Sequence, residues 1–189
     1  MIIYVLIIVL VMKHVYDLRK EQMYEVDGYK VRNPSDTESI RRLKLLSKVT
    51  VSLQKIIRKN TKHASHAGCK KLLERFECPD GVCRIQEKSH EFDHLAAYSV
   101  DKGKLIGMCT NHDGEYTDEN TMIFVYLHEL AHIMSEEYAH DVEFWNNFSD
   151  LLEIAISHNL YVYQPFHVHN INYCGENIEF TPYTPKNKI

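Results

Sequence analysis

The segment 122–145, MIFVYLHELAHIMSEEYAHDVEFW, constrains the fold more than any other part of the sequence, because it places ionisable side chains inside an apolar run. His128, Glu129 and His132 form the pattern H-E-x-x-H. Residues four apart share one face of a helix, so the two histidines can bind a single cation together. Glu129 lies about 100° around the helix from His128, where its carboxylate can accept a proton from water beside the cation. The pattern therefore predicts a catalytic zinc site, which keeps one coordination position open.

The apolar residues around this pattern indicate that its helix is largely buried. Three ionisable groups would be costly to bury there without a metal to bind them. The alternative is a surface helix that carries the pattern by chance, and the flanking apolar run argues against it. The chain also has 12 histidines among its 189 residues, and histidine is the commonest metal ligand. We therefore expect one bound Zn²⁺ ion, with Glu129 as the catalytic residue.

A catalytic zinc site needs a third protein ligand, and the sequence offers two main candidates. His140 would lie about 12 Å beyond His132 along an unbroken helix, too far to share the ion. We therefore expect the helix to end about one turn after His132, with Asp141 capping the next helix or orienting a histidine. No glycine or proline forces that turn, so Glu153 on the following helix is the alternative ligand. Three loop histidines are weaker candidates: His112, His167 and His169.

The N-terminus begins with an apolar run, MIIYVLIIVLVM, over residues 1–12. A helix of that length spans about 18 Å, against about 30 Å for the hydrocarbon core of a bilayer. Extended to residues 1–18, with Lys13 reaching the headgroups, it predicts a single-pass membrane anchor. The segment lacks the charged start and small-residue cleavage site of a signal peptide, and a buried first element is the other alternative. Basic residues follow the run, which places the rest of the chain on the cytosolic side.

Length and composition fit one folded domain with extensions. The chain is 44% hydrophobic and 25% charged, so most of it should bury a core. The net charge of −4 argues against a basic nucleic-acid binder, and nucleic acid is not an expected partner. Five cysteines are an odd number and too few for a disulfide scaffold, so we expect mostly reduced thiols.

Hydrophobic spacing and turn signals place several elements. A capping box from Ser35 to Glu38 precedes an apolar stripe at helical spacing, which predicts a long helix. The basic face of this helix is interpreted as solvated, with contact to anionic lipid headgroups as the alternative. Asp101–Lys104 separates two apolar stretches and predicts a β-hairpin over 95–110. Further helices are expected at 66–76, from near Asn120, and at 141–158.

The run HELAHIMSEEYAHDVEFW resembles the active-site segment of the WLM and SprT-like zinc metallopeptidases. Members of that family have HELAH or a close variant, a short turn, and a third histidine near H-D-x-x-F-[WY]. In this sequence those positions are His128, Glu129, His132, His140, Asp141, Phe144 and Trp145. The resemblance covers about residues 37–160 and is specific over 121–146. It implies zinc ligation by His128, His132 and His140.

The resemblance also implies a fold. It predicts a zincin-like α+β domain over residues 35–160, with a small mixed or antiparallel sheet and an active-site helix, preceded by the transmembrane helix. The edge strand around Leu105 to Cys109 would bind an extended peptide by β-augmentation. A juxtamembrane linker at 19–34 and an aromatic C-terminal extension at 161–189 complete the division. Small anchored relatives resemble proteins carried by large DNA viruses, which points to a viral or host membrane.

The leading hypothesis is a membrane-anchored zinc endopeptidase that hydrolyses protein or peptide substrates with metal-activated water. Glu129 would take a proton from the water and pass it to the leaving amine. The oxyanion would be held by zinc and by one tyrosine or histidine donor. The sequence does not choose among four candidate tyrosines: Tyr138, Tyr161, Tyr163 and Tyr173. The second hypothesis is a catalytically silent structural or adaptor membrane protein of the same fold, against which the intact H-E-x-x-H pattern argues. Proteolysis linked to nucleic acid is disfavoured by the net charge.

Overall fold

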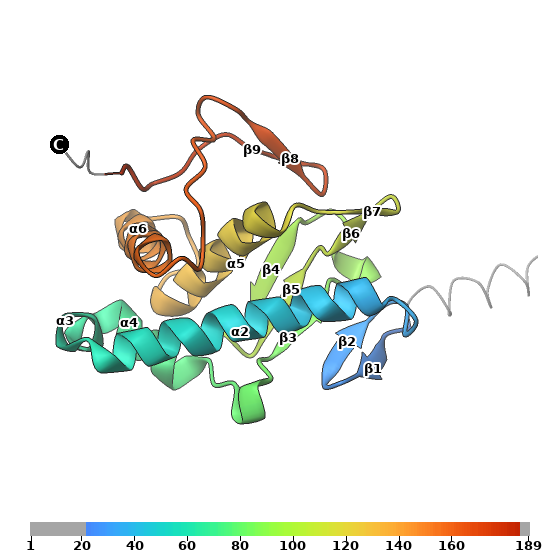
Figure 1. The fold of residues 1–189 in the computed structure, drawn as a ribbon, viewed down its shortest axis with the longest axis horizontal. Helices are drawn as coiled ribbons and strands as arrows, with labels where there is room; N and C mark the ends of the chain where they lie inside the picture. The colour runs from blue at the N-terminus through green and yellow to red at the C-terminus, as the bar shows by residue number, and fades with distance from the viewer. Residues whose placement is uncertain (1–21, 186–189) are drawn as a thin grey trace, which may run out of the picture.

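A three-stranded mixed sheet organises residues 22–185, the part of the chain that the computed structural model describes (Figure 1). The strand order is β3–β5–β4, with β3 at Ile85–Glu87, β5 at Leu105–Met108 and β4 at Ala97–Val100. β3 runs parallel to β5, whereas β4 runs antiparallel to it in the hairpin predicted over 95–110. The predicted edge strand, Leu105–Cys109, is wrong: β5 is central because β3 pairs with its other side, and β4 is the outer strand.

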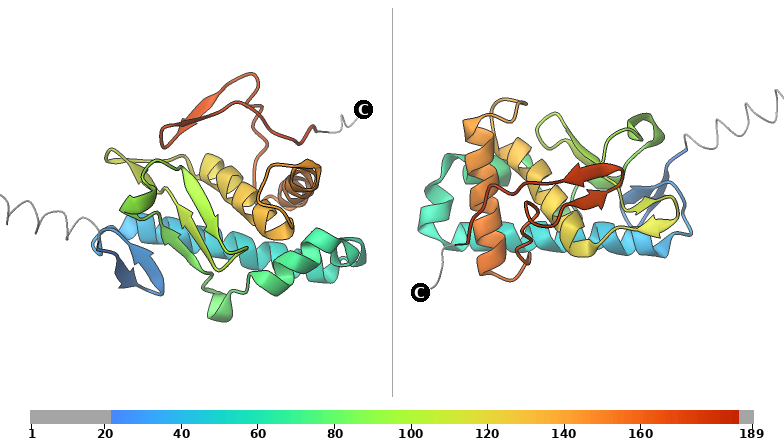
Figure 2. Two further views of the ribbon diagram at one scale, coloured as in Figure 1. Left: turned by 180° about the vertical axis from the view of Figure 1, so that it is seen from behind. Right: turned by 90° about the horizontal axis from the view of Figure 1, so that it is seen from above.

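Helices cover one face of this sheet. α2 (Thr37–Lys59) and α5 (Glu119–Met134) lie on the same side of it, as the views from behind and from above show (Figure 2). α2 contacts β3, and α5 contacts β4. α5 also contacts α4 (Ala67–Arg75) and α6 (Val142–Ser157), so it is buried on most sides, as its apolar sequence predicts.

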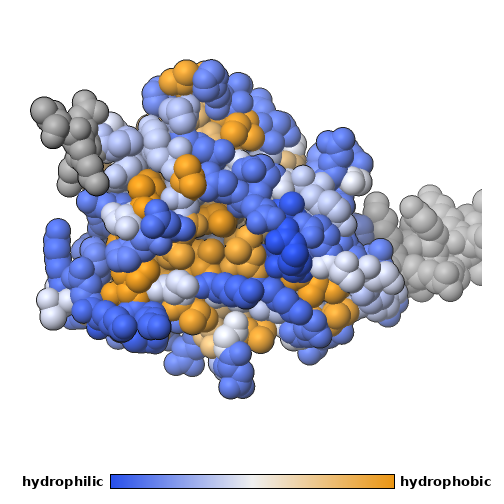
Figure 3. Space-filling model, in the orientation of Figure 1, coloured by the Kyte–Doolittle hydropathy of each residue, from blue (hydrophilic) through white to orange (hydrophobic). Residues whose placement is uncertain are grey.

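The remaining described elements are short. They are α3 (Thr61–Ser65), the 3₁₀ turns η1 (Pro79–Gly81) and η2 (His90–Phe92), and the antiparallel pairs β1 (Tyr24–Val26) with β2 (Tyr29–Val31), β6 (Asn111–His112) with β7 (Glu115–Tyr116), and β8 (Ile171–Tyr173) with β9 (Glu176–Ile178). The predicted helices at 66–76, from near Asn120 and at 141–158 are confirmed as α4, α5 and α6. Polar side chains cover most of the face seen in Figure 1, and hydrophobic ones show through mainly in its middle (Figure 3).

The long helix α2 begins one residue later than the capping box predicts. Its N-cap is Asp36, whose side chain accepts a hydrogen bond from the backbone N–H of Ser39 at 2.9 Å. The apolar stripe is buried, as its spacing predicts: Ile40, Leu43, Leu46, Val49 and Leu53. Most of the basic face is exposed, and Arg42 is an exception because its guanidinium binds the carbonyl of Thr117.

The fold predicted from the sequence, a zincin-like domain behind a transmembrane helix, is wrong in that form. No helix within residues 22–185 is long and apolar enough to cross a membrane. Even α2, with 23 residues, carries a charged face along its length. The predicted anchor at 1–18 lies outside the described residues. The structure shows an α+β fold with helices on one face of a mixed sheet.

The predicted juxtamembrane linker, 19–34, belongs to the folded domain in its described part. β1 and β2 form a hairpin there, and the side chains of Tyr29 and Val31 are buried. The Tyr29 hydroxyl donates a hydrogen bond to Ser47 Oγ of α2 at 2.8 Å. Both residues of the turn Asp27–Gly28 have positive φ, as a type I′ hairpin turn requires. This Asp-Gly pair was the signal for a hairpin in the sequence.

Two disulfides contradict the expectation of reduced thiols. Cys78 is bonded to Cys83, and Cys109 is bonded to Cys174. Within the described residues Cys69 is the free cysteine, and it is buried. The expectation failed because cysteine pairing depends on spatial proximity, which a cysteine count does not give.

The C-terminal extension, 161–189, packs on the domain in its described part. The side chains of Tyr161, Phe166 and Tyr173 are buried. The Tyr173 hydroxyl donates a hydrogen bond to the carbonyl of Cys109 at 2.6 Å, next to the disulfide at that residue. Seen from above, β8 and β9 lie across α5 (Figure 2). The extension is therefore a covering element of the fold rather than a free tail.

Replacement of Gly107 by alanine should destabilise the sheet. Gly107 pairs with Tyr98 across β4 and β5, and a Cβ atom there would come within 2.2 Å of the Tyr98 ring. The ring would have to leave a place where its hydroxyl accepts a hydrogen bond from Gln86 Nε2 at 3.1 Å. We expect Gly107→Ala to lower the free energy of unfolding by about 1–3 kcal/mol in urea denaturation.

The same substitution in a Tyr98→Ala background serves as the control. With the ring removed, the added methyl group has no aromatic neighbour to displace, so Gly107→Ala should cost at least about 1 kcal/mol less there. Equal costs in the two backgrounds would show that the ring contact is not the cause.

Removal of the two disulfides should have unequal effects on stability. Their cysteines are separated by 65 residues for Cys109–Cys174 and by 5 residues for Cys78–Cys83. In the chain-entropy model the longer loop contributes about 4 kcal/mol and the shorter about 2 kcal/mol. Guanidinium denaturation should therefore show a larger loss for the Cys109→Ser, Cys174→Ser double variant than for the Cys78→Ser, Cys83→Ser double variant. A larger loss of stability in the Cys78→Ser, Cys83→Ser variant would contradict the chain-entropy explanation.

Candidate metal site and cleft

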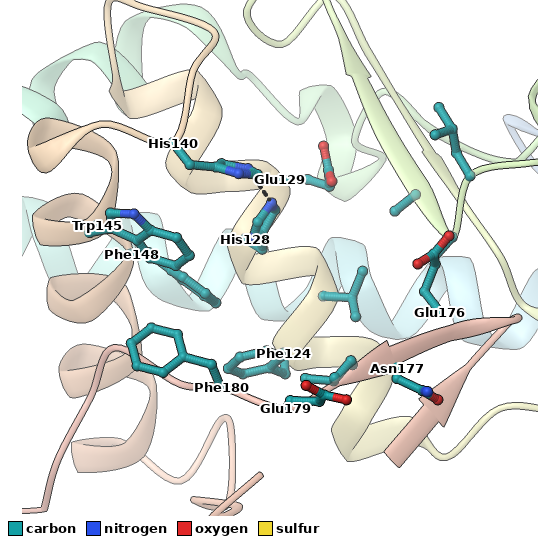
Figure 4. Close-up of a pocket in the computed structure, with 15 residues that line it drawn as sticks. Phe124, His128, Glu129, His140, Trp145, Phe148, Glu176, Asn177, Glu179 and Phe180 are labelled. Carbon is teal, nitrogen blue, oxygen red and sulfur yellow. Dashed lines mark hydrogen bonds between the residues drawn. The ribbon is translucent and has the colours of Figure 1, made fainter. Parts of the chain in front are cut away.

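Three histidine rings converge at the C-terminal half of α5. His128 and His132 lie one turn apart on α5, and His140 lies in the loop before α6. Figure 4 shows His140 next to His128. Nε2 of His140 is 3.1 Å from Nε2 of His128 and 3.1 Å from Nε2 of His132. Within the described residues, these three side chains form a group whose ligand atoms could hold one metal ion. Their assignment as zinc ligands stays a prediction.

The two nitrogen separations from His140 Nε2, both 3.1 Å, are close to those around a tetrahedral zinc ion. Bonds of about 2.0–2.1 Å at tetrahedral angles place two ligating nitrogens about 3.3 Å apart. Burial lowers the pKa of His128 to about 3 and the pKa of His132 to about 4, and His140 adds to both shifts. The neutral ring, which this environment favours, is the form that binds a metal. The donor set of three imidazoles is also one that zinc accepts in catalytic sites.

The chain turns back after α5 without a glycine or a proline. Ser135, the C-cap, is extended, with φ −98° and ψ 152°. Lys102 Nζ donates a hydrogen bond to the carbonyl of His132 at 3.2 Å. Arg75 Nη1 donates to the carbonyls of Ile133 and Ser135 at 3.1 and 3.3 Å. These contacts satisfy carbonyl groups that the end of a helix leaves without partners.

The hairpin turn between β4 and β5 brings Lys102 to the end of α5. Gly103 in this turn has φ +101°, and a Cβ atom there would come within 3.1 Å of Ile133, so the turn packs directly on α5. Lys102 Nζ also donates to the carbonyl of Glu137 at 2.5 Å and lies 4.1 Å from the centre of the Tyr138 ring. One side chain therefore contacts both the end of α5 and the loop that follows.

The start of α6 fixes the other end of this loop. Asp141 is the N-cap of α6 and accepts a hydrogen bond from the backbone N–H of Phe144 at 2.8 Å. Of the two roles predicted for Asp141, capping is the one that the structure shows. The Phe144 ring packs against all three histidine rings, at centroid distances of 4.4–4.8 Å. The rings are therefore held from the side by an aromatic contact as well as by the chain.

Glu129 lies beside the histidine group with its side chain almost fully buried. The residue is 6% exposed and lines the same cavity as His128 and His140. Burial raises the pKa of Glu129 to about 7, and a hydrogen bond with Ser99 of β4 opposes part of this shift. A carboxyl group whose pKa lies near 7 is well suited to take up and release a proton at neutral pH.

A cavity of about 500 Å³ opens beside Glu129 and the histidines. Its size is typical of ligand sites, and its walls are mostly apolar. It is lined by residues of α5 and α6, of the stretch leading into β4, and of the C-terminal hairpin, as Figure 4 shows. Besides His128, Glu129 and His140, the lining residues are Leu95–Ala97, Phe124, Val125, Trp145, Phe148 and residues 176–180.

The other candidates lie away from the histidine group. Glu153, the alternative third ligand, lines a separate cavity together with His66 and Asp150. His112, His167 and His169 do not join the group of ligand atoms found within residues 22–185. The four tyrosines considered as oxyanion donors do not line the cavity: Tyr138, Tyr161, Tyr163 and Tyr173. The structure thus assigns no tyrosine to that role.

The sequence did not predict that the C-terminal extension contributes to the cavity wall. Ile178 and Phe180 line the cavity, although the extension has no hydrophobic period from which to predict this. The available signal was Cys174, because its bond to Cys109 brings the extension to the end of β5. Five cysteines allow too many pairings for that signal to be decisive.

Substitution of His140 should weaken zinc binding. Its Nε2 is one of three converging nitrogens, so His140→Ala leaves two ligands and should weaken the binding of zinc more than about hundredfold. The measurement is competition for zinc with a chelator of known affinity, followed by the zinc content per chain. Glu153→Ala is the matched control and should bind zinc as the wild type does. An unchanged zinc affinity of the His140→Ala variant would refute the assignment of His140 as a ligand.

Comparison with known proteins finds viral relatives. The chain is 28% identical over 151 residues to an uncharacterized protein of Acanthamoeba polyphaga mimivirus, over 78% of this chain and 75% of the relative. It is 45% identical over 49 residues to an uncharacterized protein of Invertebrate iridescent virus 6, and 36% identical over 81 residues to one of Invertebrate iridescent virus 3. These two matches cover 26% and 42% of this chain, and 28% and 49% of the relatives. No family model and no solved structure matches the chain. The relatives indicate a viral origin.

Proposed function

We propose that this chain is a zinc-dependent endopeptidase. The observation that carries the proposal is the convergence of three imidazole nitrogens beside the buried carboxyl group of Glu129, with His128, Glu129 and His140 lining one cavity. Three protein ligands leave the fourth position of a tetrahedral site open to solvent or substrate. When bound, zinc supplies Lewis acidity, which polarises a substrate carbonyl and makes water acidic enough to ionise near neutral pH.

Glu129 is the group that moves the proton. It accepts a proton from the attacking water and delivers it to the amine that leaves when the peptide bond breaks. Burial favours the neutral form of this carboxyl group, which suits the second step, in which it carries the proton to the leaving amine.

The outer strand β4 provides a place for an extended substrate. Leu95 and Ala96, which lead into β4, and Ala97, its first residue, line the cavity, and β4 is the outermost strand of the described sheet on that side. A peptide added along this edge would gain main-chain hydrogen bonds, which recognise any sequence. Strand addition of this kind supports a protein or peptide substrate. The peptide would pair with β4 rather than with the predicted segment at Leu105.

The resemblance to the WLM and SprT-like metallopeptidases adds support. The positions that carry it include Phe144 and Trp145, and both have a place at this site: Phe144 packs on the histidine rings and Trp145 lines the cavity. The silent adaptor is the second hypothesis, and the intact H-E-x-x-H pattern with its buried Glu129 favours the enzyme.

Substitution of Glu129 should separate metal binding from catalysis. Glu129→Gln keeps the shape of the side chain but removes its capacity to accept a proton, so hydrolysis should fall about 10²–10⁴-fold while zinc binding persists. The measurement is the hydrolysis of fluorescein-labelled casein by zinc-loaded protein, with zinc content measured in parallel.

Glu137→Gln is the matched control, because Glu137 is exposed in the loop before His140 and contacts Lys102 through its backbone. It should hydrolyse casein at the wild-type rate. Full activity of Glu129→Gln would contradict the role of Glu129. Zinc binding by a wild-type protein that hydrolyses no casein would favour the adaptor.

A further inference from the structure

The wall of the cavity opposite α5 comes from the C-terminal extension. Five consecutive residues, 176–180, line the cavity, and they begin with strand β9. In Figure 4, Phe180 lies close to Phe124 and Phe148, whereas Glu176 and Asn177 lie further along the hairpin. The Phe180 ring stands edge-on to Trp145, with ring centroids 5.5 Å apart. Residues far apart in the sequence thus enclose one space.

The chemistry of this space differs between its interior and its rim. Phe124, Trp145, Phe148 and Phe180 form an aromatic chamber, in which Phe124 and Phe148 are 5.0 Å apart by ring centroids. Aromatic surfaces favour an apolar occupant of substantial size. Glu176 and Glu179, which are exposed on the extension, give the rim a negative charge. An acidic side chain would be repelled at that rim.

The chamber adjoins the group that would hold the reacting bond. His128, Glu129 and His140 line the same cavity as the aromatic side chains, and the His140 and Trp145 ring centroids are 5.5 Å apart. A peptide whose carbonyl group lies at the histidines therefore has a neighbouring side chain within reach of the chamber. The chamber therefore affects which side chain the peptide can carry next to the carbonyl group at the histidines.

We propose that the C-terminal hairpin is the substrate-selecting wall of the site. It admits a bulky, uncharged apolar side chain next to the scissile bond and excludes an acidic one, with Phe180 as the specificity-determining residue. This inference rests on the proposed peptidase function, because it names the class of peptide which that site accepts.

The hairpin holds its position through a covalent bond. Cys174, at the turn between β8 and β9, is bonded to Cys109 at the end of β5, and Tyr173 donates a hydrogen bond to the Cys109 carbonyl. The strands β8 and β9 are only three residues long, and a two-stranded hairpin of that size is not stable by itself. Selection therefore depends on this disulfide.

The test uses the fluorescence of Trp145, which is the single tryptophan of the chain and lines the chamber. The full chain carries Glu129→Gln, so that no probe is hydrolysed. N-acetyl-phenylalaninamide should give a saturable change in emission and bind about tenfold tighter than the corresponding aspartic acid amide. The Glu176→Gln, Glu179→Gln double variant should show a smaller difference in affinity between the two probes. Equal affinity for the two probes would overturn the proposal.

Phe180→Ala tests the selecting residue. Phe180 is 58% exposed, so its truncation removes the chamber wall without opening the core, and the phenylalanine probe should bind about tenfold more weakly. Val168→Ala is the matched control, because Val168 is a similarly exposed apolar residue of the extension that does not line the cavity. Unchanged affinity in Phe180→Ala would refute the proposal.

The disulfide variants test the tether. The Cys109→Ser, Cys174→Ser double variant should lose the preference for the phenylalanine probe, and the Cys78→Ser, Cys83→Ser double variant should keep it. Near-ultraviolet circular dichroism verifies that each variant is folded. Preserved selectivity without the Cys109–Cys174 bond would refute the tethered wall.

The binding measurement needs neither zinc nor turnover, so the two proposals fail separately. Selective binding by a chain that hydrolyses no casein would refute the peptidase function alone. Hydrolysis of casein without selective binding would refute the selecting wall alone.

Discussion

The candidate site depends on one reversal of the chain, which places His140 Nε2 at 3.1 Å from the nitrogens of both histidines on α5. Along a continued helix the same residue would lie about 12 Å from His132. The reversal requires α5 to end with its carbonyl groups satisfied, and Lys102 and Arg75 provide those hydrogen bonds. Asp141 then starts α6 at once. The geometry of the three rings is thus set by residues that would never touch a metal.

Whether the sequence predicted a feature depends on how far apart in the chain the interacting residues lie. The pairing of His128 with His132 and the place of Glu129 depend on helical spacing, which is local and can be read directly. The end of α5 depends on Lys102 and Arg75, which lie some 30 and 60 residues away in the chain. The residues near His132 gave no reason for a turn there, so the sequence alone left Glu153 open as an alternative to His140.

The same distinction holds for the fold. The helices followed from their apolar spacing, and the β4–β5 hairpin followed from its turn residues. The pairing of β3 with β5 is parallel and joins short segments on either side of β4, so no local pattern indicated it, and β5 was taken for an edge. The covering role of the extension depends on the bond between Cys109 and Cys174, a contact over 65 residues. Short strands fixed by a long-range bond leave little trace in a sequence.

The bond between Cys109 and Cys174 has a further consequence, since it closes a covalent ring that contains all of α5, the loop after it and all of α6. The three histidines and Glu129 lie within this ring. Residues 136–140 are exposed, so this loop is open to cleavage, and a nick there would place His132 and His140 on different segments of backbone. Both segments would still belong to one molecule. In its oxidised form the chain could thus be cut beside its candidate metal ligands without releasing any of them.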